Sequence, residues 1–233
     1  MKGKYKIFKG AGLALTGLLI VCFALSFAYA AGDAKGEPSG GYDKNYRVTT
    51  VKSVRSGDAV VGAVLQIVDK NGTVIEEWTS GAGEHPLNAR LIAGATYTLR
   101  EKNVPAGYVK AADVTFTVSK DGSVDAVDMK DDWTKVTVLK YSNATHTLVA
   151  GAVLQIIDAD NGTVVYEWTT DGTGTRFEGF LTAGKKYILR EKVAPAGYTV
   201  AADVAFTVSA SGAEDTVTMY NDYTKVTIRK VAK

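Results

Sequence analysis

The sequence predicts an all-β protein, in which two tandem β-sandwich domains follow an N-terminal signal peptide. Three observations predict this class. Short segments rich in Val, Ile, Thr, Tyr and Phe alternate apolar and polar residues, and Gly, Asn and Asp separate them. The sequence of residues 46–133 recurs in residues 134–223. After residue 30, no segment has the apolar periodicity of an amphipathic helix.

Composition limits the class of partner. Apolar residues make up 46% of the 233 residues and charged residues 22%, which excludes a wholly disordered chain. The formal net charge of +2 depends on four lysines within the first nine residues. After residue 30 the chain has 23 basic and 25 acidic residues, a net charge of −2. Such a chain has no electrostatic preference for nucleic acid or for an anionic membrane.

Residues 1–30 have the three parts of a secretory signal peptide. Residues 1–9 are basic, residues 11–27 are apolar, and Ala28-Tyr29-Ala30 forms a small-x-small cleavage pattern. We therefore expect cleavage after Ala30 and a secreted product at the cell surface, in the cell wall. The alternative is an uncleaved membrane anchor, but the apolar run is shorter than the about 20 residues of a membrane span. The only cysteine, Cys22, lies in this run, so the exported chain has no disulfide.

The remaining chain is a long-period repeat. The Gly-rich composition of residues 31–45 predicts a flexible leader. GAVLQI occurs at Gly62 and, 89 residues later, at Gly151. The motifs NGTV, EWT, LREK, PAGY, AADV, FTVS and TKVT also occur twice. A period of this length predicts domains rather than solenoid units. Residues 224–233 repeat the beginning of the second domain, which predicts a truncated third repeat and a fragment of a longer array.

The strands of each repeat can be placed in order. The first contains Lys52 or Lys140, and the GAVLQI segment follows it. Asn71-Gly72 and Asn161-Gly162 predict tight hairpin turns in which both central residues take positive φ. The runs from Tyr187 to Glu191 and from Val217 to Asn221 alternate in the same way and predict later strands. We expect about seven strands per domain.

Strand alternation directs three polar residues of each repeat into the interior. Side chains alternate between the two faces of a sheet, so a residue shares its face with the residue two positions earlier. In the second repeat, the pairs Val136/Val138, Tyr187/Leu189 and Val217/Met219 lead to Lys140, Glu191 and Asn221, respectively. In the first repeat the corresponding residues are Lys52, Glu101 and Asp131, with the weakest alternation before Lys52.

Two interpretations of these residues compete. One is a buried ion pair with a hydrogen-bonded amide, because a lone buried charge is very costly. The other is a covalent crosslink. Burial favours the neutral forms of an amine and of a carboxylic acid, and a neutral amine is a nucleophile. A nearby Glu can polarise the attacked carbonyl and shuttle protons, and a folded core supplies proximity. Attack on Asp would release water, and attack on Asn would release ammonia.

At these residues the chain resembles a known family. The pattern L-x-x-G-x-x-Y-x-L-x-E-x-x-x-P-x-G-Y runs from Leu91 to Tyr108 and again from Leu181 to Tyr198. Together with the Lys-bearing strand and GAVLQI, it resembles the collagen-adhesin B-type, or pilin-type, repeats of Gram-positive surface proteins. The resemblance implies a prealbumin-like, inverse-immunoglobulin sandwich. It also implies spontaneous isopeptide bonds between the first and last strands, promoted by Glu.

The resemblance assigns roles to residues of both repeats. The implied bonds are Lys52–Asp131 with Glu101 as promoter and Lys140–Asn221 with Glu191 as promoter. Asp132 and Asp222 are neighbouring alternatives that strand alternation disfavours. Lys230 would be the crosslinking lysine of the third repeat. The first repeat departs from the second at residues 80–86, which lack the Thr-Asp-Gly-x-Gly sequence of residues 170–174, so the second bond is the better supported one.

The resulting functional hypothesis is a structural stalk or shaft of a surface adhesin or pilin. Its partners would be neighbouring repeats, and other parts of the intact protein would contact host matrix or cell-surface proteins. The alternative is an extracellular ligand-binding module for a host protein or carbohydrate, without crosslinks, for which the divergent residues 82–90 and 172–180 are the candidate site. We expect no enzymatic turnover, no cofactor and no metal, since His85 and His146 have no counterparts in the other repeat.

Overall fold

The computed structural model describes residues 48–54, 57–121 and 125–232, with only the backbone given for residues 48–54 and Asp125. The predicted signal peptide, its cleavage site and the leader lie outside the described residues. Within the described ranges every regular element is a strand, which confirms the all-β class. These ranges therefore contain no helix that could span a membrane.

The first domain consists of two four-stranded sheets. One sheet has the order β4-β1-β8-β6 and the other has the order β3-β2-β5-β7. The strands are β1 (Val48–Val54), β2 (Val64–Val68), β3 (Val74–Thr79), β4 (His85–Pro86), β5 (Thr96–Asn103), β6 (Tyr108–Val109), β7 (Val114–Thr117) and β8 (Asp125–Trp133).

The second domain repeats this architecture with seven strands. A three-stranded sheet has the order β12-β9-β15, and a four-stranded sheet has the order β11-β10-β13-β14. The strands are β9 (Lys135–Ser142), β10 (Ala150–Asp158), β11 (Val164–Asp171), β12 (Thr175–Glu178), β13 (Lys186–Val193), β14 (Val204–Thr207) and β15 (Glu214–Asn221).

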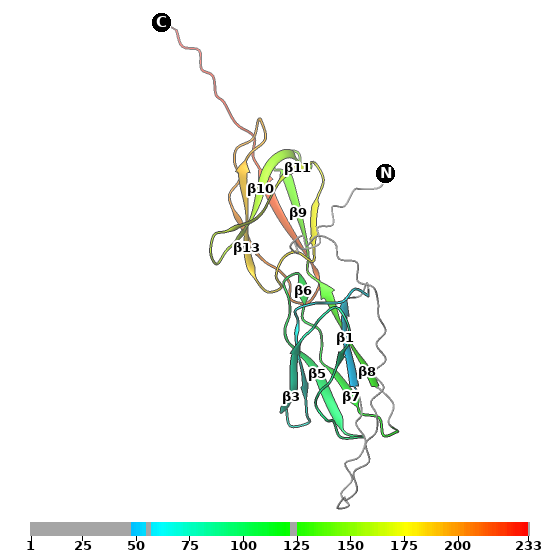
Figure 1. Ribbon diagram of the computed structural model, residues 1–233. Coiled ribbons are helices and arrows are strands. Elements are labelled where there is room, and N and C mark those ends of the chain that lie inside the picture. The colour runs from blue at the N-terminus through cyan, green and yellow to red at the C-terminus, as the bar shows by residue number, and fades with distance from the viewer. Residues whose placement is uncertain (1–47, 55–56, 122–124, 233) are drawn as a thin grey trace, which may run out of the picture.

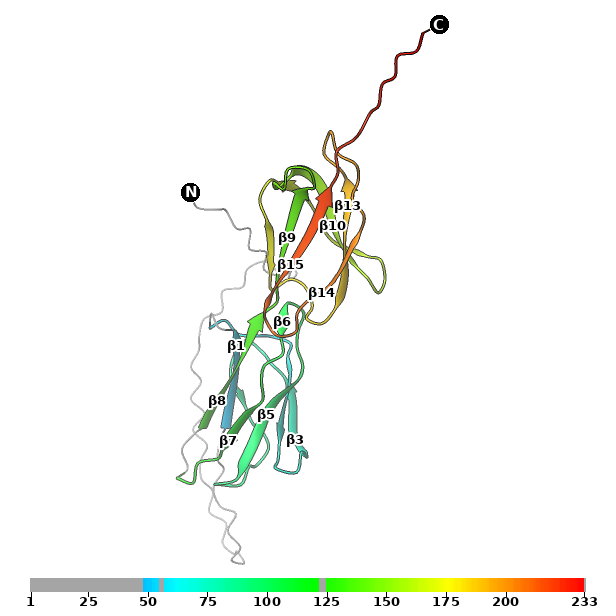
Figure 2. The ribbon, with the colours of Figure 1, turned by 180° about the vertical axis from the view of Figure 1, so that it is seen from behind.

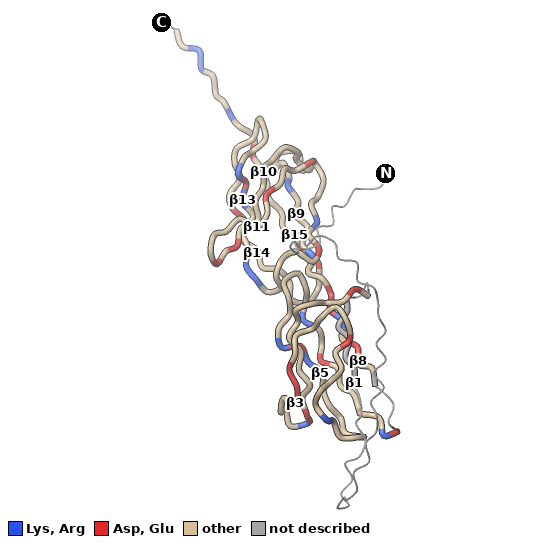
Figure 3. The backbone as a smooth tube through the Cα atoms, viewed as in Figure 1, with Lys and Arg blue, Asp and Glu red and all other residues tan. Residues whose placement is uncertain are grey.

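The two domains lie end to end. Only Thr134 separates the end of β8 from the start of β9, so the chain passes directly from one sandwich into the next. Seen from behind, β9 and β15 run side by side along the second domain, and the C-terminal segment leaves from its far end (Figures 1 and 2). Figure 3 shows basic and acidic residues along both domains.

The first and last strands of each domain are parallel neighbours. In the first domain β1 pairs with β8, with Lys52 opposite Met129. In the second domain β9 pairs with β15, with Lys140 opposite Met219. Because the chain enters along one strand of the pair and leaves along the other in the same direction, tension on the two ends of a domain shears this pair along its length.

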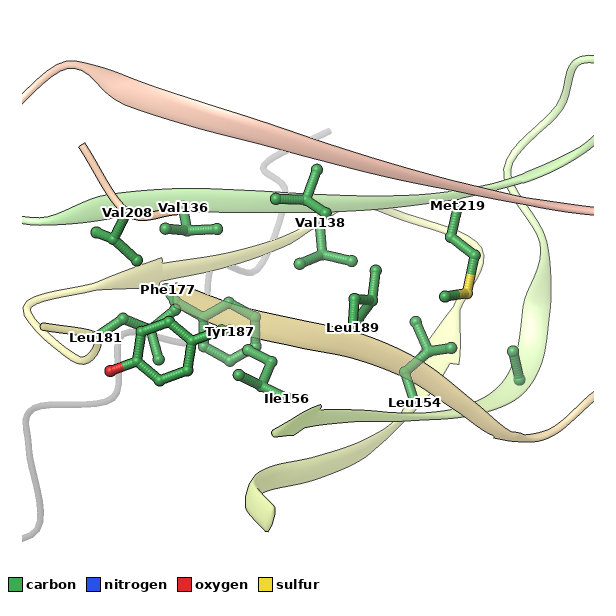
Figure 4. Close-up of a cluster of buried hydrophobic side chains, with 12 residues drawn as sticks. Val136, Val138, Leu154, Ile156, Phe177, Leu181, Tyr187, Leu189, Val208 and Met219 are labelled. Atoms are coloured by element: carbon green, nitrogen blue, oxygen red, sulfur yellow. The ribbon is translucent and has the colours of Figure 1, made fainter. Parts of the chain in front are cut away.

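Each sandwich closes over an apolar core. Strand β9 alternates buried and half-buried residues over its whole length, as one face against a core requires. In the second domain the core residues from both sheets include Val138, Leu154, Leu189 and Met219, which Figure 4 shows close together. The two residues on each of β9, β13 and β15 that the alternation argument assigned to the core are buried.

The structure corrects the predicted hairpin turns. Gly72 and Gly162 have positive φ, but Asn71 and Asn161 do not. In the first turn Gly72 N donates to Asp69 O (3.0 Å), which forms a four-residue turn closed by a left-handed glycine and followed by a bulge. The Asp69 carboxylate accepts hydrogen bonds from the amides of Asn71 and Thr73 (2.8 Å each), which stabilises the longer turn.

Candidate functional site

Three strands of the second domain bring Lys140, Glu191 and Asn221 together. We call these three residues the buried trio. Lys140 lies on β9 and Asn221 at the end of the adjoining β15, whereas Glu191 comes from β13 in the facing sheet. All three side chains are buried, and their solvent-exposed fractions are 1%, 0% and 3% for Lys140, Asn221 and Glu191, respectively. Each lies two positions after a core residue on its own strand, namely Val138, Met219 or Leu189 (Figure 4).

Glu191 lies between the amine and the amide. Its Oε1 is 3.4 Å from Lys140 Nζ. Its Oε2 accepts hydrogen bonds from Asn221 Nδ2 (2.7 Å) and from the backbone amide of Ala201 (2.7 Å). Asn221 Nδ2 also donates to Thr199 O (2.6 Å). One carboxylate therefore contacts both groups that an amide-forming reaction would join.

The trio is incompletely satisfied as a polar cluster. Among the described residues, none accepts a hydrogen bond from Lys140 Nζ or donates one to Asn221 Oδ1. Buried polar groups without such partners are costly. Burial lowers the pKa of the Lys140 amine below its ordinary value, and the neighbouring Glu191 acts in the opposite direction. As a net effect, the neutral, nucleophilic form of the Lys140 amine is more favoured here than it is for a lysine in water.

The first domain has the same scaffold. Glu101 and Asp131 are buried, with exposed fractions of 0% and 1%. Ala111 N donates to Glu101 Oε2 (2.9 Å), as Ala201 does to Glu191. Glu101 lies opposite Leu65 on β2, as Glu191 lies opposite Leu154 on β10. Lys52 occupies the register position of Lys140, but its side chain lies outside the described residues.

The neighbouring acids point elsewhere. Both Asp132 carboxylate oxygens accept hydrogen bonds from Lys135 Nζ (3.0 and 3.1 Å) near the domain junction. Asp222 is exposed and accepts a hydrogen bond from Asn143 Nδ2 (3.0 Å). Alternation along β8 and β15 accounts for both positions, because each acid immediately follows a residue that faces the core.

Sequence reasoning missed the backbone groups that hold the glutamate. The amides of Ala111 and Ala201 orient Glu101 and Glu191, and the carbonyl of Thr199 orients Asn221. A signal for the two amides was present, because both alanines belong to the repeated AADV motif. Backbone donors leave no residue-type signature, so the motif alone did not indicate their role.

The segments that differ most between the repeats form corresponding edge strands. In the first domain β4 pairs with β1, and His85 stacks on Trp78 with ring centroids 4.5 Å apart. In the second domain β12 pairs with β9, and Trp168 Nε1 donates to Thr175 Oγ1 (3.0 Å). Both repeats have the tryptophan of EWT at this place, but the residue of the edge strand that contacts it differs between them.

Glu76 anchors the divergent segment of the first domain. Its carboxylate contacts His85 Nε2 (2.8 Å) and accepts hydrogen bonds from the amides of Asn88 (2.9 Å) and Ala89 (2.7 Å). Burial acts to raise the pKa of Glu76, but the hydrogen bonds from His85, Ala89 and Asn88 outweigh it and lower the pKa below 4.5. The stabilisation is therefore present above pH 4.5 and is lost as the pH falls through the lower folded-state pKa.

We expect Glu76→Gln to destabilise the first domain by about 1–2 kcal/mol at pH 7, and by less at a pH low enough to protonate the wild-type carboxyl, below its lowered pKa. Urea unfolding at both pH values measures the two differences. Glu84→Gln is the matched control, because Glu84 is exposed on the same segment. An equal loss of stability at both pH values would contradict the assigned role of the charge.

Comparisons with known proteins identify the fold family. The profile of the SpaA prealbumin-like fold domain matches the chain twice, over residues 47–133 and 134–223. No curated protein sequence matches the chain. Among solved structures, the shaft pilin SpaA of Lactobacillus rhamnosus GG is 18% identical, with a TM-score of 0.38, and the match covers 79% of this chain and 100% of that one.

Two other solved structures are similar at the same level. The Bacillus anthracis TIE protein is 22% identical, with a TM-score of 0.43, and the match covers 76% of this chain and 34% of that one. The minor pilin of Streptococcus agalactiae is 16% identical, with a TM-score of 0.37, and the match covers 81% of this chain and 99% of that one.

Proposed function

The chain belongs to the SpaA family of prealbumin-like fold domains, and from this membership and the buried trio we propose that it is a structural stalk of a cell-surface pilin or adhesin, stiffened by intramolecular isopeptide bonds. The position of Glu191 between the Lys140 amine and the Asn221 amide, inside an apolar core, carries the proposal. Neighbouring domains are the partners of such a stalk, and the predicted signal peptide would export it.

The reaction in the second domain is an amide exchange. A proton passes from the Lys140 ammonium to the Glu191 carboxylate, which leaves a neutral amine beside a neutral acid. A half-turn of the Asn221 carboxamide then places Oδ1 against the protonated Glu191, which polarises the carbonyl. Lys140 Nζ attacks Asn221 Cγ, the Cγ–Nδ2 bond breaks, and ammonia leaves with the proton that Glu191 returns. The Glu191 carboxylate then takes one of the two protons of the attacking amine, so that the new amide nitrogen keeps one. The step occurs once per domain and is no enzymatic turnover.

The first domain would perform the corresponding condensation. Lys52 would attack Asp131 Cγ, and one carboxyl oxygen would leave as water with Glu101 shuttling protons. The backbone places Lys52 and Asp131 on adjoining parallel strands in the same register as Lys140 and Asn221. The product bond is the same amide in both domains, so the two domains differ in the leaving group and not in the crosslink.

The bonds would lie in the path of tension. Lys140 lies on the entry strand of its domain and Asn221 on the exit strand. A covalent bond between these strands carries force across the sheared pair and bypasses the 80 residues from 141 to 220. An exported chain without disulfides would thus gain a covalent load path from side chains that the fold already buries.

Intact mass spectrometry of residues 31–233 tests the proposal. We expect the wild type to weigh about 35 Da less than its sequence, the sum of one ammonia and one water, and Glu101→Ala/Glu191→Ala to have its full calculated mass. A loss of about 17 Da would restrict the proposal to the Lys140–Asn221 bond. Full mass in a folded wild type would contradict the crosslink.

Asn221→Asp is the matched control for this measurement. The variant retains an attackable carbonyl and would form the identical amide, but it would release water instead of ammonia. We therefore expect the second domain of the variant to lose about 18 Da rather than about 17 Da. Folding of the Glu101→Ala/Glu191→Ala variant should be verified by far-ultraviolet circular dichroism, so that a full mass reports absent chemistry rather than an absent fold.

A further inference from the structure

The junction between the two domains is a built interface centred on Thr134. This residue is 1% exposed. Its amide donates to Gly107 O (3.0 Å) in the first domain, and its hydroxyl donates to Leu181 O (2.7 Å) in the second. Gly179 N returns a hydrogen bond to Thr134 O (2.9 Å). One linker residue therefore ties a loop of each domain to the other.

Two glycines allow the loops to touch. Gly107 has a φ of +89°, and a Cβ on it would collide with the carbonyl oxygen of Gly179. A Cβ on Gly179 would lie 3.4 Å from the Trp133 ring. Lys135, the first residue of β9 in the second domain, donates from Nζ to the Asp132 carboxylate of the first domain (3.0 Å) and to Gly212 O of its own domain (3.3 Å). This close approach fixes the second domain against the first.

The far end of the second domain has residues that correspond to those of the first domain at this interface. Thr224 N donates to Gly197 O (2.9 Å), as Thr134 N does to Gly107 O. Tyr198 forms a β-bridge with Tyr223, and the centroids of their rings are 4.8 Å apart. In the first domain the corresponding residues, Tyr108 and Trp133, are paired between β6 and β8. Gly197 has a φ of +87°, and among the described residues nothing lies within 4 Å of a Cβ placed on it. Gly197, Tyr198, Tyr223 and Thr224 form what we call the distal face.

The sequence that follows the distal face repeats the sequence at the start of the second domain. Residues 225–230 read Lys-Val-Thr-Ile-Arg-Lys, and residues 135–140 read Lys-Val-Thr-Val-Leu-Lys. Val226 and Ile228 are 84% and 91% exposed, whereas the corresponding Val136 and Val138 are buried in a core. The alternating apolar residues of this segment therefore match a first strand that has no sheet to join among the described residues (Figure 1).

We propose that the distal face is the docking surface for a further domain of the same fold, whose first strand is the segment 225–231. Its loop corresponding to Gly179–Leu181 would lie against Gly197, and Thr224 would bridge the two as Thr134 does. Lys230 would take the position of Lys140 in that domain. The proposal extends the stalk role proposed above, but docking needs no crosslink and its test does not measure one.

The glycine pair Gly107 and Gly197 provides a matched test. Both have nearly the same positive φ, so alanine imposes a similar backbone strain at each. Only Gly107 contacts another domain. In the two-domain chain, without any added domain, we expect Gly107→Ala to increase tryptic cleavage after Lys135 about tenfold, because the junction opens. Gly197→Ala should leave that cleavage unchanged.

An added domain then tests the distal face itself. Residues 135–223 are appended after Thr224, so that Thr224 takes the place of Thr134 at the new junction. Cleavage at the new junction lysine should be as slow as at Lys135, and Gly197→Ala should now increase it about tenfold. Small-angle scattering should show an extended, stiff three-domain particle that becomes flexible in the variant.

Two outcomes would overturn the proposal. In the first, the new junction is cleaved equally fast in the three-domain chain and in its Gly197→Ala variant, so the added domain does not dock. In the second, the unmodified chain forms dimers that Gly197→Ala abolishes, so the distal face binds another copy of the chain instead. Neither readout depends on mass loss, so failed docking is distinguishable from failed crosslinking.

Discussion

Stretching the chain from its two ends is expected to release no length from the 80 residues between Lys140 and Asn221, whereas Glu191→Ala should release about 270 Å from them, at about 3.4 Å per residue. The physical reason is the parallel pairing of β9 and β15, which places the crosslinked side chains on the two strands that bear the load. Single-molecule force spectroscopy on residues 31–233 measures the released length directly.

Asn221→Asp separates the covalent effect from a change in packing. This variant would form the same amide as the wild type and should be equally inextensible. Glu101→Ala should add a corresponding release from the first domain and leave the second domain unaffected. A long release from the wild-type second domain would show that its strands are held by hydrogen bonds and packing alone.

The second large effect concerns thermal stability. Closing a loop of about 80 residues is expected to stabilise the second domain by about 4.5 kcal/mol through the lost entropy of the unfolded chain. For a domain of this size that corresponds to a difference in Tm of about 20–30 °C. Differential scanning calorimetry of the wild type and of Lys140→Met/Glu191→Gln, which cannot crosslink, measures the difference.

The direction of this change discriminates between the two interpretations of the trio. If Lys140 and Glu191 formed only a buried ion pair, replacing both charges with neutral side chains of similar size would be neutral or stabilising, because the desolvation of two charges is relieved. If they form and promote a crosslink, the same replacement lowers Tm strongly. Asn221→Asp, which would retain the bond, should melt with the wild type.

Much of the site could be predicted from alternation and repetition. The pattern around Val138 and Lys140 placed the lysine on the core face, because a strand has only two faces and one was already apolar. Recurrence in both repeats marked Glu191 and Asn221 in the same way. Alternation also separated Asn221 from Asp222, since adjacent residues point to opposite sides, and the structure places Asp222 in solvent.

Other features depended on contacts that sequence patterns do not encode. The Asn-Gly pairs predicted tight turns, but hydrogen bonds to the Asp69 carboxylate favour a longer turn in which only the glycine has positive φ. The roles of Thr134 and Gly107 were also not predictable, because their partners are backbone atoms of a different domain. A threonine between two strands gives no sign of what faces it.

The sequence by itself determined the all-β class, the two-domain repeat and the face on which each trio residue lies. These are local properties, set by the period of two along a strand and by recurrence along the chain. Only the tertiary structure decided which faces meet. The parallel pairing of β9 with β15 and the packing of β13 across the core place Glu191 between Lys140 and Asn221, because strands far apart in sequence become neighbours only when the sandwich closes.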